Sequence, residues 1–170
     1  NYGLGYVYSI DNRRTGLNPK AGTFLNFSQD LALVGDDNFL RSNLRMGAET
    51  YVRNDDVRLT AVLESGALSF EANKASRITD RYFMSARTFR GFAPGGLGPR
   101  QKGISGSSIP YNDALGGDYY AVARFETQFP IGLPEEYGID FGAFFDVGSV
   151  WGLDSSLQSA SGLLYDSFKT

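Results

Sequence analysis

The chain contains neither cysteine nor histidine among its 170 residues. Without cysteine it can form no disulfide and no thiolate metal site. Without histidine it lacks the commonest general base and the commonest metal ligand, so neither a Ser-His-Asp nor a Cys-His mechanism can operate within it. We therefore expect no catalytic residue, no metal site and no cofactor, and we expect that the chain is not an enzyme.

An excess of positive charge and a long apolar run are also missing. The 16 basic residues are outnumbered by 19 acidic residues, whereas a general nucleic-acid binder usually carries a basic surface. No apolar run approaches the roughly 18–20 residues of a membrane helix. Phenylalanine, tyrosine and glycine are abundant instead, at 13, 10 and 21 residues. Nucleic acid is therefore excluded from the expected partners, and no transmembrane helix is expected.

Apolar and polar residues alternate with a period of two along much of the chain, which is typical of a β-strand with two different faces. The pattern covers residues 2–10, 23–33, 40–50, 57–63, 119–129 and 139–147. It predicts an all-β unit of about six strands. One face is expected to hold Leu25, Phe27, Leu44, Met46, Leu59, Leu63, Phe125, Phe141 and Phe145. The other is expected to hold Arg41, Arg45, Glu64, Glu126 and Asp146.

Periodicity alone does not separate a soluble β-sandwich from an outer-membrane barrel, because each has one apolar and one polar face. The alternating segments favour the barrel, since they are longer than the usual strand of about 5–6 residues and near the about 9–11 residues of a tilted membrane strand. Short polar turns contrast with one long connection, at about residues 67–117, and such connections are normally functional or disordered. Aromatic residues near strand ends suggest interfacial girdles: Phe39, Tyr51, Tyr119, Tyr120, Phe129, Tyr137 and Trp151.

The long connection contains the sharpest motif of the sequence, Thr88-Phe89-Arg90-Gly91-Phe92 followed by Gly95-Gly96-Leu97-Gly98-Pro99-Arg100. A glycine-rich loop suggests phosphate binding, but this one lacks the Lys-Ser/Thr ending and the strand-to-helix context of a P-loop. It resembles instead the long-loop motif of BamA-type outer-membrane assembly factors, the bacterial surface antigen or outer-membrane insertase superfamily. Two departures leave the subfamily open: Phe89 replaces the usual valine, and Ser85-Ala86 replaces an upstream Gly-Gly.

The resemblance continues along nearly the whole chain. Residues 114–126 and 144–151 resemble the two strands that follow the loop in this family, and Asp11, Pro19 and Gly22 resemble its Asp…Pro-x-x-Gly turn. The resemblance implies an antiparallel transmembrane β-barrel of about 16 strands with the long loop on its lumen side. Residues 1–170 would then form a partial C-terminal barrel domain. We expect the soluble N-terminal repeats and the final barrel strands to lie outside this chain.

The function that the resemblance implies is the assembly and insertion of β-barrel proteins into the bacterial outer membrane. Its expected partners are the lipid bilayer, nascent outer-membrane proteins and, mainly through the N-terminal repeats, the lipoproteins of an assembly complex. Within the superfamily, a sister translocation or assembly factor or a polypeptide-transport pore remains an alternative. An unrelated outer-membrane barrel, including a barrel enzyme, and a soluble β-sandwich binding module are alternatives from other classes.

The charged face predicts a specific contact for Arg90. Counting by two places Glu126 and Asp146 on this face, on the two consecutive strands after the long connection, where same-face side chains come within about 5 Å. Two such carboxylates repel each other unless they share a cation, and a guanidinium can bind both. In the resembled family, the motif arginine contacts these acidic wall positions. We therefore expect Arg90 to pair with Glu126 and Asp146, the alternative being a solvated loop residue. We also expect a charge ladder among Arg41, Arg45, Arg58, Glu49 and Glu64.

Overall fold

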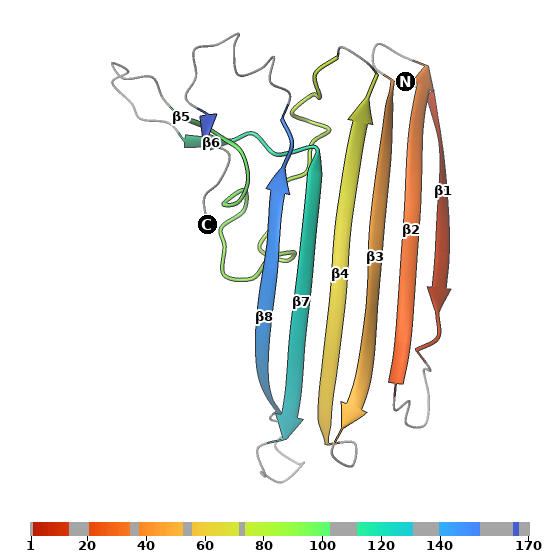
Figure 1. Ribbon diagram of the computed structural model, residues 1–170, viewed down its shortest axis with the longest axis vertical. Helices are drawn as coiled ribbons and strands as arrows, with labels where there is room; N and C mark the ends of the chain where they lie inside the picture. Colours follow the sequence, from red (N-terminus) through yellow and green to blue (C-terminus); the bar gives the residue numbers. More distant parts are fainter. Residues whose placement is uncertain are drawn as a thin grey trace.

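The computed structural model describes residues 2–13, 21–34, 38–52, 56–71, 74–102, 112–130, 140–153 and 165–166. One antiparallel sheet dominates these residues (Figure 1), in the order β1 (Tyr2–Asp11), β2 (Ala21–Val34), β3 (Phe39–Val52), β4 (Val57–Phe70), β7 (Tyr119–Pro130) and β8 (Asp140–Trp151). A small second sheet has the order β6 (Asn112–Ala114), β5 (Arg100–Lys102) and β9 (Tyr165–Asp166). In the described part of the chain, no helix is long and apolar enough to cross a membrane.

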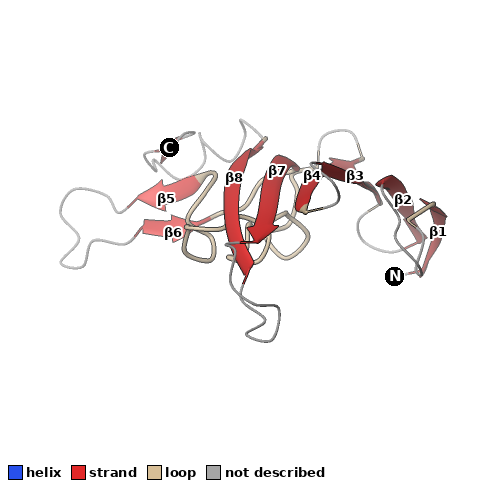
Figure 2. Cartoon of the chain, turned by 90° about the horizontal axis from the view of Figure 1, so that it is seen from below, coloured by secondary structure: helices blue, strands red, loops and turns tan. Residues whose placement is uncertain are grey.

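The large sheet is open and curved (Figure 2). Among the described residues, β1 and β8 each pair on one side only, so the sheet has two free edges. The loop that follows β4, as far as β5, lies on the concave side, whereas β5 and β6 extend past β8 (Figure 2). The prediction of an open, curved antiparallel sheet is therefore confirmed.

The two faces of the sheet follow the predicted alternation. The register aligns Leu25 with Met46 and Met46 with Leu63, and it aligns Phe125 with Phe145. These residues lie on the convex face, which leaves large apolar side chains half exposed: Leu31, Leu33, Leu40, Met46, Leu59, Leu63, Phe125, Phe141, Phe145 and Val147. A soluble sandwich would cover such a face with a second sheet, whereas in the described part of this chain nothing packs on it.

The strands are long enough to cross a bilayer at a tilt. β2, β3 and β4 have 14 residues each, and β7 and β8 have 12. At about 3.3 Å per residue, 14 residues extend about 46 Å, and a tilt of about 45° reduces the span to about 33 Å. The hydrocarbon core of a bilayer is about 30 Å thick.

The long connection differs from the expected one in its start and in its content. β4 continues to Phe70, so the connection covers residues 71–118 rather than beginning at about 67. The last part of β4 has few large residues, and its apolar Leu68 lies opposite Arg41 on the concave face, 2% exposed. The connection also contains β5, β6 and a bridge between Tyr82 and Gly117, which sequence alternation did not indicate.

The aromatic girdles were predicted only in part. Tyr119 stacks on Trp151 at one end of the convex face, with ring centroids 6.2 Å apart, and Phe129 lies 6.4 Å from Phe141 at the other end. Three residues were wrongly assigned to the girdles, because the strand parity turns them to the concave face: Phe39, Tyr51 and Tyr120. Tyr137 lies outside the described residues.

Candidate functional site

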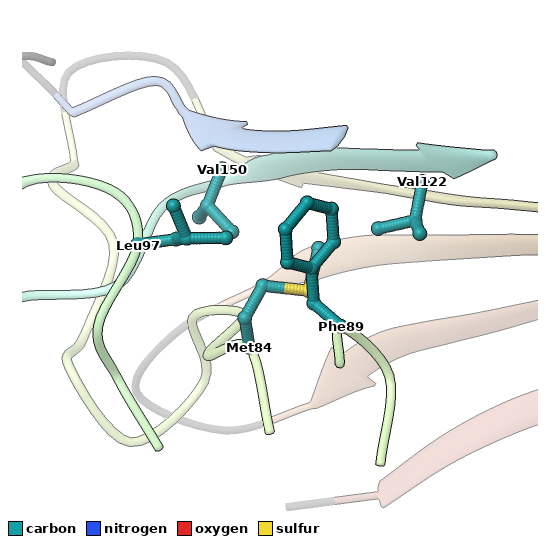
Figure 3. Packing of buried hydrophobic residues seen from close by; sticks show 5 residues of the cluster. All are labelled: Met84, Phe89, Leu97, Val122 and Val150. Atoms are coloured by element: carbon teal, nitrogen blue, oxygen red, sulfur yellow. The ribbon is translucent and has the colours of Figure 1, made fainter. Parts of the chain in front are cut away.

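The connection is packed against the concave face by a small apolar cluster (Figure 3). Met84, Phe89 and Leu97 come from the connection, and Val122 and Val150 come from β7 and β8. Each of the five side chains is less than a tenth exposed. Burying a side chain of this size stabilises a protein by about 1.5–3 kcal/mol. The cluster therefore holds the middle of the connection on the wall.

A tight turn presents Phe89 to this cluster. The backbone N–H groups of Thr88 and Phe89 both donate to the carbonyl oxygen of Ser85 at 3.0 Å. The hydroxyl groups of Ser85 and Thr88 lie 3.0 Å apart, within hydrogen-bonding distance. Ser85 thus closes the turn with both its carbonyl and its hydroxyl group. Phe89 fills the apolar cluster with a large aromatic side chain.

Arg90 follows directly and binds both carboxylates with which it was expected to pair. Its Nε donates to Oδ2 of Asp146 at 2.9 Å, and its Nη2 donates to Oδ1 at 2.8 Å. Its backbone N–H donates to Oδ2 of Asp146 at 3.2 Å, and its Nη1 donates to Oε2 of Glu126 at 2.8 Å. The ring of Phe144 lies below the guanidinium, 3.9 Å from its carbon to the ring centroid. We call Arg90, Glu126 and Asp146 the Arg90 clamp.

The two halves of the Arg90 clamp differ in burial. The Asp146 side chain is 3% exposed, whereas those of Arg90 and Glu126 are 31% and 37% exposed. A buried carboxylate requires a partner, so Asp146 depends on Arg90 more than Glu126 does. The hydrogen bonds from Arg90 to Asp146, followed by those to Glu126, raise the pKa of the Arg90 guanidinium. Arg90 is therefore charged at every physiological pH.

A second group of charges lies beside the Arg90 clamp on the concave face. Glu64 on β4 accepts from Arg124 on β7 and from Nε of Arg45 on β3 at 2.9 Å. Nη1 of Arg124 also donates to the carbonyl oxygens of Arg87 and Thr88, at 3.3 and 3.5 Å. Arg124 therefore links the wall to the turn that precedes Arg90.

The predicted charge ladder is present with one change. Arg58 donates to Glu49 at 2.7 Å, and Arg45 pairs with Glu64, which lies directly opposite in the register. Arg41 reaches instead into the connection, where its Nη2 donates to the carbonyl oxygen of Asp80 at 2.7 Å. Residues of the ladder thus join neighbouring strands to each other, and Arg41 joins β3 to the connection.

The remaining motif residues surround the Arg90 clamp. Gly91 has a φ of 87° and Gly98 a φ of 97°, in the left-handed region that favours glycine. A Cβ on Gly98 would lie 2.9 Å from Cβ of Val150, so this glycine also allows close approach to β8. Pro99 is fully buried. The Phe92 ring lies 4.9 Å from that of Phe89.

The expected turn motif lies apart from this site. Asp11 ends β1 and pairs with Arg13 at 2.6 Å. A Cβ on Gly22 would lie 2.8 Å from Cα of Arg13. Pro19 lies outside the described residues. The structure therefore places Asp11 and Gly22 at the β1–β2 connection and brings neither to Arg90.

Sequence reasoning missed several residues that hold the loop. Arg124 lies on the charged face by simple alternation and could have been found from that signal. Phe144 lies on the same face by the same alternation. Met84, Leu97 and Tyr82 gave no such signal, because their contacts depend on the path of the connection.

Comparison with known proteins now identifies the family. A family model described as the Omp85 superfamily domain matches residues 1–166. The chain belongs to the Omp85 superfamily. A relative named outer membrane protein assembly factor BamA, from Neorickettsia risticii (strain Illinois), is 28% identical over 150 residues, which are 88% of this chain and 19% of that protein.

Animal relatives have a similar degree of likeness. The sorting and assembly machinery component 50 homolog of Xenopus tropicalis is 32% identical over 131 residues, 75% of this chain and 26% of that protein. The human homolog is 28% identical over 145 residues, 84% of this chain and 29% of that protein. The chain thus spans less than a third of the length of these relatives.

The fold also matches a solved structure. The crystal structure of BamA from Haemophilus ducreyi lacking POTRA domains 1–3 superposes with a TM-score of 0.78 at 21% identity, covering 94% of this chain and 32% of that chain. The open sheet of this Omp85 chain therefore has the fold of part of the BamA β-barrel. The resemblance to BamA-type proteins that the loop motif indicated is confirmed.

Proposed function

We propose that this Omp85 chain is a wall segment, a partial C-terminal barrel domain, of a protein that assembles and inserts β-barrel proteins into the bacterial outer membrane. The observation that supports this most is the Arg90 clamp, in which a 3% exposed wall carboxylate is bound by the loop motif of the family. Relatives named as an outer-membrane assembly factor and as sorting and assembly machinery components support the same activity.

The proposed roles follow from the two faces of the sheet. The apolar convex face contacts the acyl chains of the bilayer, and the charged concave face lines a hydrated lumen. The Arg90 clamp and the apolar cluster keep residues 84–97 inside this lumen, against β7 and β8. The loop braces the wall while strands of a nascent outer-membrane protein pair with a free strand edge elsewhere in the barrel.

The proposed activity breaks no covalent bond and uses no cofactor or metal. Soluble N-terminal repeats and the final barrel strands, both outside this chain, complete the protein in this proposal. The repeats bind the lipoproteins of the assembly complex, and the barrel binds lipid and nascent protein. A bacterial rather than a mitochondrial outer membrane is favoured because the bacterial relative matches 88% of the chain and the animal relatives 75% to 84%.

Reconstitution of the full-length protein tests this proposal. Purified protein in liposomes is given an unfolded β-barrel substrate, and the folded, heat-modifiable form is measured over time. Folding is expected to be faster than in protein-free liposomes, and slower with Arg90→Ala than with the matched control Arg13→Ala, whose ion pair is exposed. If folding is not accelerated while an unfolded polypeptide crosses the membrane, the translocation pore of the same superfamily is the correct function.

A further inference from the structure

Tyr82 closes the base of the loop immediately before β7. Its N–H donates to the carbonyl oxygen of Gly117 at 2.8 Å, and the N–H of Gly117 donates back to Tyr82 at 3.0 Å. These two bonds form an isolated antiparallel bridge. The bridge therefore closes the segment that begins at Tyr82 and ends at Gly117, and Arg90 belongs to this segment.

The side chain of Tyr82 reaches a different part of the wall from Arg90. Its hydroxyl donates to Oδ1 of Asn43 on β3 at 2.8 Å and lies 3.3 Å from the carbonyl oxygen of Ser42. β4 separates β3 from β7 in the sheet. The hydroxyl of Tyr82 thus contacts β3, whereas Arg90 contacts Glu126 on β7 and Asp146 on β8.

The Tyr82 ring packs over Gly66 of β4, whose lack of a side chain leaves room for it. The rings of Tyr82 and Tyr120 lie 4.8 Å apart, centroid to centroid, over Gly66 on β4. A Cβ on Gly66 would lie 2.7 Å from Cζ of Tyr82 and would also meet the Tyr120 ring. Burial raises the pKa of Tyr82 to about 12, so its hydroxyl keeps the proton that it donates to Asn43.

We propose that Tyr82 is a positioning residue that fixes the base of the loop on β3 and β4, independently of the Arg90 clamp on β7 and β8. We call Tyr82, Asn43 and Gly66 the tyrosine anchor; Tyr120 of β7 packs against it and also against the apolar cluster. The tyrosine anchor and the Arg90 clamp together hold the loop on four strands, and releasing one leaves the other in place. The role of the loop in bracing the wall during assembly rests on the proposed function. The attachment of the loop by Tyr82 does not depend on that function.

Spin-label distances in the purified full-length protein test the independence of the two attachments. Each protein carries one label at Leu40→Cys, on the convex face of β3. The second label is at Ile78→Cys, near the loop base, in one protein and at Arg87→Cys, beside the Arg90 clamp, in the other. All three side chains are exposed. Tyr82→Ala is expected to widen the Ile78 distance distribution roughly twofold and to leave the Arg87 distribution unchanged. Arg90→Ala is expected to widen the Arg87 distribution and to leave the Ile78 distribution unchanged.

A second variant and a control keep this test decisive. Gly66→Ala leaves Tyr82 in the chain but displaces the rings of Tyr120 and Tyr82, so it is expected to widen the Ile78 distribution as well. Tyr8→Ala removes an exposed tyrosine of the edge strand β1, and it should change neither distribution. The proposal is overturned if Arg90→Ala widens both distributions, or if neither Tyr82→Ala nor Gly66→Ala widens the Ile78 distribution. No substrate is present, so failure of the reconstitution assay alone would overturn only the proposed function.

Discussion

The unequal burial of the Arg90 clamp predicts that its two carboxylates contribute very different amounts to stability. Arg90→Ala removes the cation that is hydrogen-bonded to the 3% exposed Asp146 and leaves its cross-strand neighbour Arg124 in place. Breaking a buried pair in this way costs about 3 kcal/mol. Glu126 is 37% exposed and Arg90 31%, so that pair is screened by solvent and contributes about 0.2–1 kcal/mol. Asp146→Ala is therefore expected to destabilise the protein more than Glu126→Ala.

Double-mutant cycles measure the two contributions separately. The full-length protein and its variants are unfolded with urea in detergent micelles, and the folded fraction is read from heat-modifiable gel migration. The Arg90→Ala and Asp146→Ala cycle is expected to give a coupling of about 1.5–3 kcal/mol, and the Arg90→Ala and Glu126→Ala cycle less than about 1 kcal/mol. Additive effects of Arg90→Ala and Asp146→Ala, or a larger coupling to Glu126, would refute this reasoning.

Three further changes are predicted for the same unfolding assay. Phe89→Ala empties the apolar cluster and should cost about 3–5 kcal/mol, whereas Phe89→Val should cost less; equal losses would contradict the packing described. Gly98→Ala should cost more than about 1 kcal/mol, because its φ is 97° and its new Cβ would lie 2.9 Å from Cβ of Val150. Arg124→Ala should destabilise more than Arg45→Ala, since their side chains are 17% and 56% exposed; the opposite order would show that Arg124 does not hold the loop.

The sequence predicted the strands wherever alternation was sustained over large residues. Alternation did not predict the end of β4, because residues 65–70 include small side chains and because the buried Leu68 lies on the concave, otherwise charged face. Alternation places a residue on a face but does not say what covers that face. Phe39 and Tyr120 were assigned to membrane girdles from their position near strand ends, whereas their parity in the strand places them on the concave face.

The candidate site was predictable to the extent that it depends on strand register. Glu126 and Asp146 share a face because their strands are consecutive and antiparallel, so counting by two was sufficient. The side chains of the connection obey no such rule. Nothing in the sequence around Tyr82 or Met84 indicates that Tyr82 contacts Asn43 on β3 or that Met84 packs with Phe89 in the cluster against the wall, since both depend on long-range packing.

Label accessibility along β7 in the reconstituted full-length protein tests most directly whether this sheet is a membrane-barrel wall. Spin labels are placed one at a time at residues 121–128, and their collisions with oxygen, which concentrates in lipid, are compared with those of a water-soluble nickel complex. High oxygen accessibility is predicted at Ala121, Ala123, Phe125 and Thr127, whose side chains lie on the convex face. Positions 122, 124, 126 and 128 should show little oxygen accessibility. Equal access of the nickel complex to both faces, or a period of two in the opposite phase, would contradict the account.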